Sequence, residues 1–252
     1  NRVMAELFLE ILSEEIPARM QKRAADDLKR LVSDGLKEAG LDFESANTYV
    51  TPRRLTLVVD GLPTETSDIS EERRGPRTDA PEKAVQGFLG SVGLTLDKVE
   101  KRETDKGEFY FVKIEKKGQK TAELLPSLIE VELAALPWPK SMRWANRRER
   151  WVRPIQSILC IFGGNVIETK HGQTMANNKT STHRFLTNAV IEVKDFSDYK
   201  KALEIGHVLI DPADRMAKIK ADAEALAKKA KLSLIDDPAL LEEVAGLVEW
   251  PV

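Results

Sequence analysis

The pattern of apolar and polar positions predicts a strand followed by a long helix at the start of the chain. Apolar side chains occupy every second position over much of residues 4–11, the spacing of a strand with one face against a core. Over residues 18–39 they recur at three- and four-residue steps, which predicts an amphipathic helix that ends at Gly40. Glu14 and Glu15 lie between the two elements and are expected at the helix start, where carboxylates favour the positive end of the helix dipole.

Turns, strands and helices are also expected along the rest of the chain. Residues 71–77 (EERRGPR) predict a turn flanked by cations, and residues 105–107 (DKG) predict a hairpin turn, because glycine accepts the positive φ that such a turn needs. Pro52 excludes an uninterrupted central strand at its position, since proline has no N–H to donate. Further strands are expected at residues 55–59, 99–104, 108–115, 155–162, 190–193 and 208–210, and further helices at residues 82–89, 121–136, 197–204, 213–229 and 239–248.

Together these elements predict an α+β fold of mixed or antiparallel sheets with packed helices. Three parts are expected: an N-terminal α+β subdomain (1–118), a second α/β subdomain with a basic, tryptophan-rich segment (119–195), and a helical C-terminal part (196–252). The chain stops at an apolar Trp-Pro-Val sequence, and we expect the helical part to continue in the native protein.

Composition narrows the class of protein. Of the 252 residues, 42% are hydrophobic and 32% charged, and no apolar run approaches the roughly 20 residues that a membrane-spanning helix needs. Residues 4–10 alternate and carry acids, so no leader peptide and a cytosolic location are expected. The single cysteine, Cys160, lies in an apolar run and is expected to be a small core residue.

One segment, residues 137–154 (PWPKSMRWANRRERWVRP), concentrates positive charge. Because the net charge of the chain is only −2, affinity for nucleic acid must come from such local clusters. Arginine and tryptophan can bind phosphates and stack on unpaired bases, so RNA or an acidic protein face is the expected partner. The alternative is that the tryptophans pack into the core and the arginines are solvated. The cations are Lys140, Arg143, Arg147, Arg148, Arg150 and Arg153, and the tryptophans are Trp138, Trp144 and Trp151.

Two shorter motifs place arginines beside proline. In TPRRL, Pro52 stiffens the chain before Arg53 and Arg54, whose side chains alternate across a strand, so that one can bind phosphate or carboxylate while the other anchors locally. In GPR, Arg77 follows a fixed turn that orders its guanidinium. The alternatives are an internal salt bridge for the first pair and an ordinary exposed turn for Arg77.

Residues for catalysis or metal binding do not stand out in the sequence. His171, His183 and His207 share no ligand spacing, and one cysteine cannot complete a Cys/His zinc site. The phosphate-binding motifs G-x-x-x-x-G-K-[ST] and G-x-G-x-x-G and the nucleophile motif G-x-S-x-G do not occur. We therefore expect no catalytic residue and no metal ligand in this chain.

A set of short motifs in fixed order carries a family resemblance. They are LEILSEEIPARM (9–20), TPRRL (51–55), RGPR (74–77), TDKGE (104–108), PKSMRW (139–144), VRP (152–154), HRF (183–185) and LEEVAGLVEWP (241–251). Any one of them is weak, but the ordered set is specific. It resembles the N-terminal region of the β subunit of bacterial heterotetrameric glycyl-tRNA synthetase, close to alphaproteobacterial sequences, over essentially the whole chain.

The resemblance implies a role in a cytoplasmic α2β2 ligase that joins glycine to its tRNA with ATP and magnesium. The aminoacylation centre of that family lies in the α subunit, so this chain is expected to bind tRNA and to assemble with α and with the rest of β, without an ATP site of its own. From charge and turn context, the expected RNA contacts are Arg53, Arg54, Arg77, Lys140, Arg143, Trp144, Arg147, Arg148, Arg150, Arg153 and Arg184.

The chain departs from the family pattern at two loops. Thr182 and Ala145 stand where the family usually has glycine, and a Cβ restricts such turns. The stretch 144–151 is also short for the family. Two other functions stay open: an assembly scaffold without RNA contact, and a self-contained enzyme on a small phosphorylated substrate. The enzyme would need Arg53, Arg77 and His183 to converge in one pocket.

Overall fold

A computed structural model describes residues 2–138, 142–143, 150–151 and 153–252, with the backbone alone at residues 142, 143, 150 and 151. Antiparallel and mixed sheets lie beside packed helices, which confirms the α+β class. In chain order the elements are β1 (Met4–Ser13), α1 (Ala18–Glu38), β2 (Ser45–Val50), β3 (Arg54–Pro63), β4 (Ile69–Arg77), α2 (Glu82–Val92), the 3-10 helix η1 (Leu96–Lys98), β5 (Glu100–Thr104), β6 (Gly107–Lys116), α3 (Thr121–Ala135), β7 (Met142–Arg143), β8 (Arg150–Trp151), β9 (Ile155–Phe162), β10 (Asn165–Val166), β11 (Lys170–His171), β12 (Thr174–Asn177), β13 (Lys179–Ser181), β14 (Val190–Glu192), α4 (Phe196–Ile205), α5 (Pro212–Lys229) and α6 (Pro238–Ala245).

The chain divides into two compact units. Unit 1 comprises residues 1–65 and 120–252, and unit 2 comprises residues 66–119. Unit 2 is therefore an insertion within the sequence of unit 1. The three-part division expected from the sequence stays a prediction.

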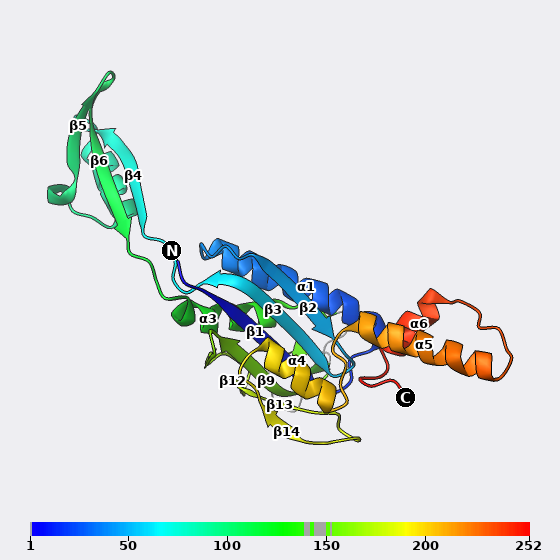
Figure 1. Cartoon of the computed structure of the whole chain (residues 1–252). Helices are drawn as coiled ribbons and strands as arrows, with labels where there is room; N and C mark the ends of the chain where they lie inside the picture. The colour runs from blue at the N-terminus through cyan, green and yellow to red at the C-terminus, as the bar shows by residue number, and fades with distance from the viewer. Residues whose placement is uncertain (1, 139–141, 144–149, 152) are drawn as a thin grey trace. The chain divides into compact units, whose positions relative to one another are not determined.

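Unit 1 is built on a seven-stranded sheet in the order β11-β12-β9-β1-β3-β2, with β10 paired to β9 (Figure 1). The long strand β1 is central and pairs antiparallel with both β3 and β9. Strand β12 runs parallel to β9, which makes the sheet mixed.

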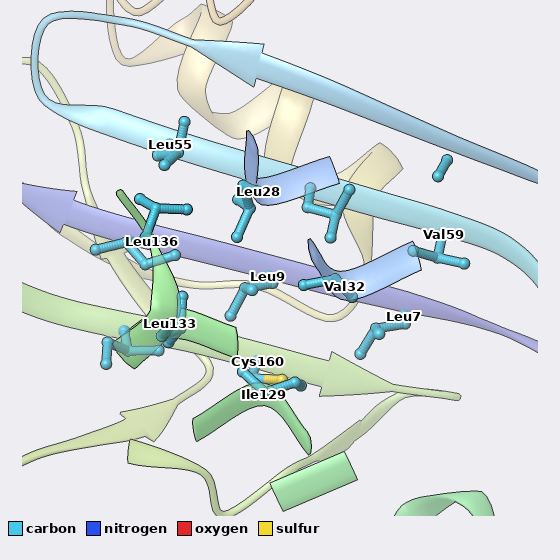
Figure 2. Close-up of a cluster of buried hydrophobic side chains, with 14 of the residues drawn as sticks. Leu7, Leu9, Leu28, Val32, Leu55, Val59, Ile129, Leu133, Leu136 and Cys160 are labelled. Carbon is cyan, nitrogen blue, oxygen red and sulfur yellow. The ribbon is translucent and has the colours of Figure 1, made fainter. Parts of the chain in front are cut away.

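Helices α1 and α3 cover one face of this sheet. The apolar stripe predicted for residues 18–39 forms α1, and its Leu28 and Val32 are fully buried against sheet residues such as Leu9 (Figure 2). From α3, Ile129 joins the same core, and Cys160 of β9 lies in it with no exposed surface. The prediction that the cysteine is a core residue is confirmed.

The opposite face of the sheet packs on α4. Phe8 of β1, Val58 of β3 and Leu159 of β9 lie against Tyr199 and Leu203 of α4. The rings of Phe8 and Tyr199 meet edge to face with centroids 4.6 Å apart. Unit 1 is thus a three-layer arrangement with the sheet in the middle, and β1 is buried on both sides.

Unit 2 is a three-stranded antiparallel sheet in the order β4-β6-β5, accompanied by α2. The guanidinium of Arg74 lies 3.7 Å from the ring centroid of Phe109, and that of Arg102 lies 4.6 Å from the ring centroid of Phe111. Arginines and aromatic rings therefore cover one another on this small sheet.

Two sequence predictions are wrong at this level. Residues 71–77 were expected to turn but belong to β4, which pairs with β6 and breaks register between Arg74 and Arg77. Residues 208–210 were expected as a strand but lie outside every strand, and their peptide N–H at Leu209 donates to the carbonyl of Glu249 at 2.9 Å. Among the described residues, no helix has the length and apolar character to span a bilayer.

Candidate functional site

Several sequence motifs meet at one end of the unit 1 sheet. Because β1 is antiparallel to β3 and β9, its last residue lies beside the first residues of those strands. The N–H of Ser13 donates to the carbonyl of Arg53 at 2.8 Å, and the N–H of Glu14 donates to that of Pro154 at 2.9 Å. We call this region the motif end; it comprises residues 13–17, 51–54, 153–156, 182–185 and 249–251.

Arg54 is the buried centre of the motif end, with no exposed side-chain surface. Its Nε donates to Oε2 of Glu249 at 2.7 Å, and its Nη1 lies 3.2 Å from Oε2 of Glu10. Nη1 also donates to the hydroxyl of Thr180 at 2.9 Å, and Nη2 donates to the carbonyl of Ser181. Of the two arginines in TPRRL, Arg54 is therefore the one that anchors locally.

The charges of this network stabilise one another. Burial by itself lowers the pKa of Arg54, but the carboxylates of Glu249 and Glu10 outweigh it, and the net direction is upward. For the acid Glu249, burial acts in the opposite direction and raises the pKa. The charge and hydrogen bonds of Arg54 and the hydrogen bond from the hydroxyl of Thr51 outweigh burial, so the pKa of Glu249 lies below its usual value. Both groups are charged at neutral pH, so the pair is a buried salt bridge.

A second buried arginine holds the segment that carries Glu249. The Nε of Arg215 donates to the carbonyl of Ala245 at 3.0 Å, its Nη1 to that of Leu209 at 2.7 Å, and its Nη2 to that of Val50 at 2.8 Å. Burial lowers the pKa of Arg215 to about 10, so it stays protonated at neutral pH. Ala245, four residues before Glu249, is thereby joined to Val50 at the end of β2.

Arg53 points to a different part of the motif end. Only 6% of the residue is exposed, and its Nη2 donates to Oε1 of Gln156 at 2.7 Å. Its Nε and Nη1 have no hydrogen-bond partner among the described residues. Burial lowers its pKa, and the neighbouring Arg54 and Arg184 act in the same direction while Glu249 opposes them. Arg53 is thus a buried cation with two donors that no described residue pairs.

The HRF motif forms a loop beside Arg53. The Nδ1 of His183 accepts the N–H of Phe185 at 3.2 Å and the N–H of Leu186 at 3.1 Å. The guanidinium of Arg184 pairs with Glu14 at 3.6 Å and with Glu15. Phe185 is 78% exposed. Acidic and basic motifs far apart in the sequence therefore neutralise each other here.

The structure gives Glu14 and Glu15 a role other than the expected one. Helix α1 has Pro17 as its N-cap residue and no acidic residue in its first turn. The two carboxylates hold Arg184 instead. The prediction that they lie at the helix start is wrong, because the helix begins three residues after Glu15.

The predicted RNA contacts fall into three groups. Arg53, Arg54, Arg153 and Arg184 belong to the motif end, whereas Arg77 lies in unit 2 and pairs with Asp79 at 3.1 Å. Arg143 and Arg150 face each other in the backbone pairing of β7 with β8. Lys140, Trp144, Arg147 and Arg148 lie outside the described residues.

Reasoning from the sequence missed Glu10, Tyr199 and Arg215. Tyr199 donates its hydroxyl to Glu10, and Thr56 lies 3.1 Å from the same hydroxyl. Glu10 did offer a signal, since a carboxylate between two apolar residues in a buried strand needs a partner. Tyr199 and Arg215 occupy helical patterns that look ordinary, so no local signal marks them.

Comparisons with known proteins agree on one family. Residues 7–252 match the family described as glycyl-tRNA synthetase beta subunit. A "Glycine--tRNA ligase beta subunit" of Rhodospirillum centenum is 47% identical over an alignment 274 residues long that covers 99% of this chain and 38% of that protein. Proteins of the same name from a Ruegeria species and Paracoccus denitrificans are 47% and 46% identical over 99% of this chain. The chain spans somewhat over a third of the length of these relatives.

Proposed function

The chain belongs to the family of glycyl-tRNA synthetase β subunits, and from this premise we propose that it helps a cytoplasmic α2β2 ligase attach glycine to its tRNA. In this proposal the chain contributes tRNA binding and subunit assembly. ATP and magnesium act in the α subunit, so no described residue is assigned to them. The partners are the α subunit, glycine tRNA and the rest of the β chain.

The single observation that supports tRNA binding is the convergence at the motif end. The basic, tryptophan-rich segment leads into this end through Arg153 and Pro154, and Pro154 is hydrogen bonded to Glu14. Arg53 places a buried positive charge nearby, and its Nε and Nη1 have no hydrogen-bond partner within the part of the chain that the structure describes. Clustered guanidinium groups bind phosphates and make affinity depend on salt. Arg54 is not included, because its donors are occupied inside the protein.

The test measures binding of glycine tRNA to the complete β subunit with its α subunit over a range of salt concentrations. A triple variant, Arg147→Ala with Arg148→Ala and Arg150→Ala, should bind more weakly, with a log K against log salt slope shallower by roughly 2. The matched control removes three exposed cations of α5, in Lys220→Ala with Lys228→Ala and Lys229→Ala. The control should leave both affinity and slope unchanged.

Other outcomes decide against parts of the proposal. If both triple variants bind tRNA like the wild type, the basic segment makes no phosphate contact. If the arginine variant loses capture of the α subunit while tRNA binding is unchanged, the segment is an assembly element. The scaffold alternative would then replace the RNA-binding one.

A separate observation favours a protein-binding role for the hairpin of α5 and α6. Large apolar side chains are exposed there, among them Leu226 at 67%, Leu232 at 70% and Ile235 at 88%. Exposed apolar groups that gather on one surface mark protein contacts. We expect Ile235→Glu to weaken assembly of the synthetase without changing its melting temperature. The control is Lys229→Glu, which changes charge at an exposed polar position of the same hairpin and should assemble normally.

A further inference from the structure

The loop at residues 182–189 presents an aromatic ring to solvent. Phe185 is 78% exposed and Leu186 is 51% exposed. A phenylalanine that folding leaves in water forgoes the stabilisation of burial, and aromatic residues presented in this way are enriched at binding sites. The ring therefore needs an explanation beyond the packing of unit 1.

The backbone that carries Phe185 is held in place by its neighbours. Besides the two bonds accepted by His183, the N–H of Thr187 donates to the carbonyl of His183 at 3.2 Å. The side-chain hydroxyl of Thr187 donates to the side-chain hydroxyl of Thr182 at 2.7 Å. The hydroxyl of Thr187 is also 2.9 Å from the carbonyl of Gly206, which joins the loop to the end of α4. A ring on such a loop loses little conformational entropy when a ligand binds it.

A cation is stacked on the same ring. The guanidinium carbon of Arg184 lies 4.6 Å from the ring centroid of Phe185. Glu14 and Glu15 hold that guanidinium from the other direction. Phe185 nevertheless keeps most of its surface exposed, so the arginine supports the ring and leaves room for a second flat partner.

Charges of both signs lie near this position. Burial lowers the pKa of His183, the carboxylate of Glu249 opposes that shift, and the charges of Arg53 and Arg184 lower the pKa further, so charges of both signs act on this loop. The carboxylates of Glu14 and Glu15 are already paired with Arg184, whereas two nitrogens of Arg53 have no partner among the described residues. A ligand suited to this setting has a flat group that can stack on the exposed ring.

We propose that Phe185 is a stacking platform for an unpaired nucleobase of the bound RNA. An unpaired nucleotide joins a flat base to an anionic phosphate, and stacking of such bases on aromatic side chains and guanidinium planes is a common mode of RNA recognition. This inference rests on the proposed role in tRNA binding and adds a specific contact to it. It assigns Phe185 a role distinct from that of the arginines, because the stacking contact is uncharged.

The test replaces Phe185 in the complete β subunit with its α subunit and measures binding of glycine tRNA. Phe185→Ala should weaken binding roughly 5- to 100-fold. Phe185→Leu keeps an apolar side chain without a flat ring and should bind as weakly as Phe185→Ala, whereas Phe185→Trp should bind at least as well as the wild type. Because no charge is removed, the salt slope should stay that of the wild type, in contrast to the triple arginine variant.

Three results would overturn the inference. The first is unchanged tRNA affinity in Phe185→Ala, with the wild type binding normally; this leaves the proposed function standing. The second is a loss of α-subunit capture in Phe185→Ala that Phe185→Leu restores, which identifies an apolar protein contact. The third is failure of the wild-type complex to bind tRNA at all, which overturns the proposed RNA binding as well. Val190→Ala, at a nearby residue that is 71% exposed, is the control and should bind tRNA normally.

Discussion

The side chain of Arg54 joins three segments that are distant in the sequence. It bonds to Glu10 of β1, to Thr180 of β13 and to Glu249 near the end of the chain. A buried ion pair adds little net stability compared with apolar residues of the same volume, but the loss of one partner leaves a buried charge without compensation. Arg54 is therefore a position where one substitution affects several elements.

We expect Arg54→Met to destabilise unit 1 by about 3–5 kcal/mol, because Glu10 and Glu249 then lose their common cation. Urea denaturation followed by the circular dichroism of the protein measures the change. Arg30→Met removes an exposed arginine that pairs with Asp27 at 3.2 Å on α1 and should cost less than about 1 kcal/mol. Equal losses in the two variants would contradict the importance of the buried network.

His183 makes the order of its loop depend on pH. Burial lowers its pKa, the charges of Arg53, His207 and Arg184 lower it further, and Glu249 opposes them. The neutral ring can accept two N–H groups on Nδ1, and the protonated ring cannot. Since the folded pKa lies below that of the unfolded chain, this contribution is fully present above about pH 6.5 and is lost as the pH falls through the lowered pKa.

Intrinsic amide hydrogen exchange slows on acidification, and at Phe185 and Leu186 the observed exchange should slow less than that, leaving an excess over the rate expected at constant protection. In His183→Asn, whose side-chain oxygen accepts a hydrogen bond but does not titrate, that excess should disappear. A persistent excess in His183→Asn would show that another group controls the loop.

At the scale of elements, the sequence predicted those that have a regular apolar pattern. Helix α1 and strand β9 were expected within one residue of their observed ends, because each buries one face or both faces against the core. Strand β4 was missed because its residues are exposed or half-exposed and show no alternation. Its structure depends on pairing with β6 and on arginines that cover aromatic rings, contacts that a local pattern does not contain.

Unit 2 offers two glycines with opposite expected effects. A Cβ at Gly75 of β4 would lie 2.5 Å from the ring of Phe88 on α2, whereas a Cβ at Gly87 of α2 would meet nothing within 4 Å. We expect Gly75→Ala to destabilise unit 2 by about 1–3 kcal/mol through overpacking. Gly87→Ala should stabilise it by about 0.5–1 kcal/mol through helix propensity. Thermal unfolding of the two variants checks both signs, and stabilisation by Gly75→Ala would mean that α2 does not pack on β4.

At the scale of the whole molecule, the insertion of unit 2 leaves its attachment points adjacent. Glu65 and Lys120 form an antiparallel bridge, and the N–H of Thr121 donates to the carbonyl of Thr64 at 2.9 Å. Replacing residues 66–119 by a short glycine and serine linker should therefore preserve unit 1, since a linker between neighbouring ends costs little entropy.

Scanning calorimetry of that deletion variant should show the unit 1 transition within a few degrees of its position in the complete chain. The intact chain, measured in parallel, is the reference. Failure of the deletion variant to unfold cooperatively would mean that unit 1 depends on the insertion for its stability.

The candidate site was only partly predictable at this scale. The arginines of TPRRL and HRF were recognised as chemically important, because local charge and turn context marked them. The internal partner of Arg54 could not be identified, since Glu249 is 195 residues away and the order of the strands brings the two together. Exposure of Phe185 likewise depends on how the loop leaves the sheet, which apolar periodicity does not describe.

The separation of Arg54 from Glu249 also has a consequence for synthesis on the ribosome. Strands β1 and β3 and their buried charges leave the exit tunnel before Glu249 has been translated, and the interval of 195 residues corresponds to roughly 10–40 s. During that time Arg54 lacks the carboxylate to which its Nε donates, and the nascent sheet carries an incompletely paired, buried cation at one end. Completion of unit 1 is thereby tied to the arrival of residues 245–250, so ribosome-bound chains stalled before Glu249 should be more sensitive to protease than released chains that contain Glu249.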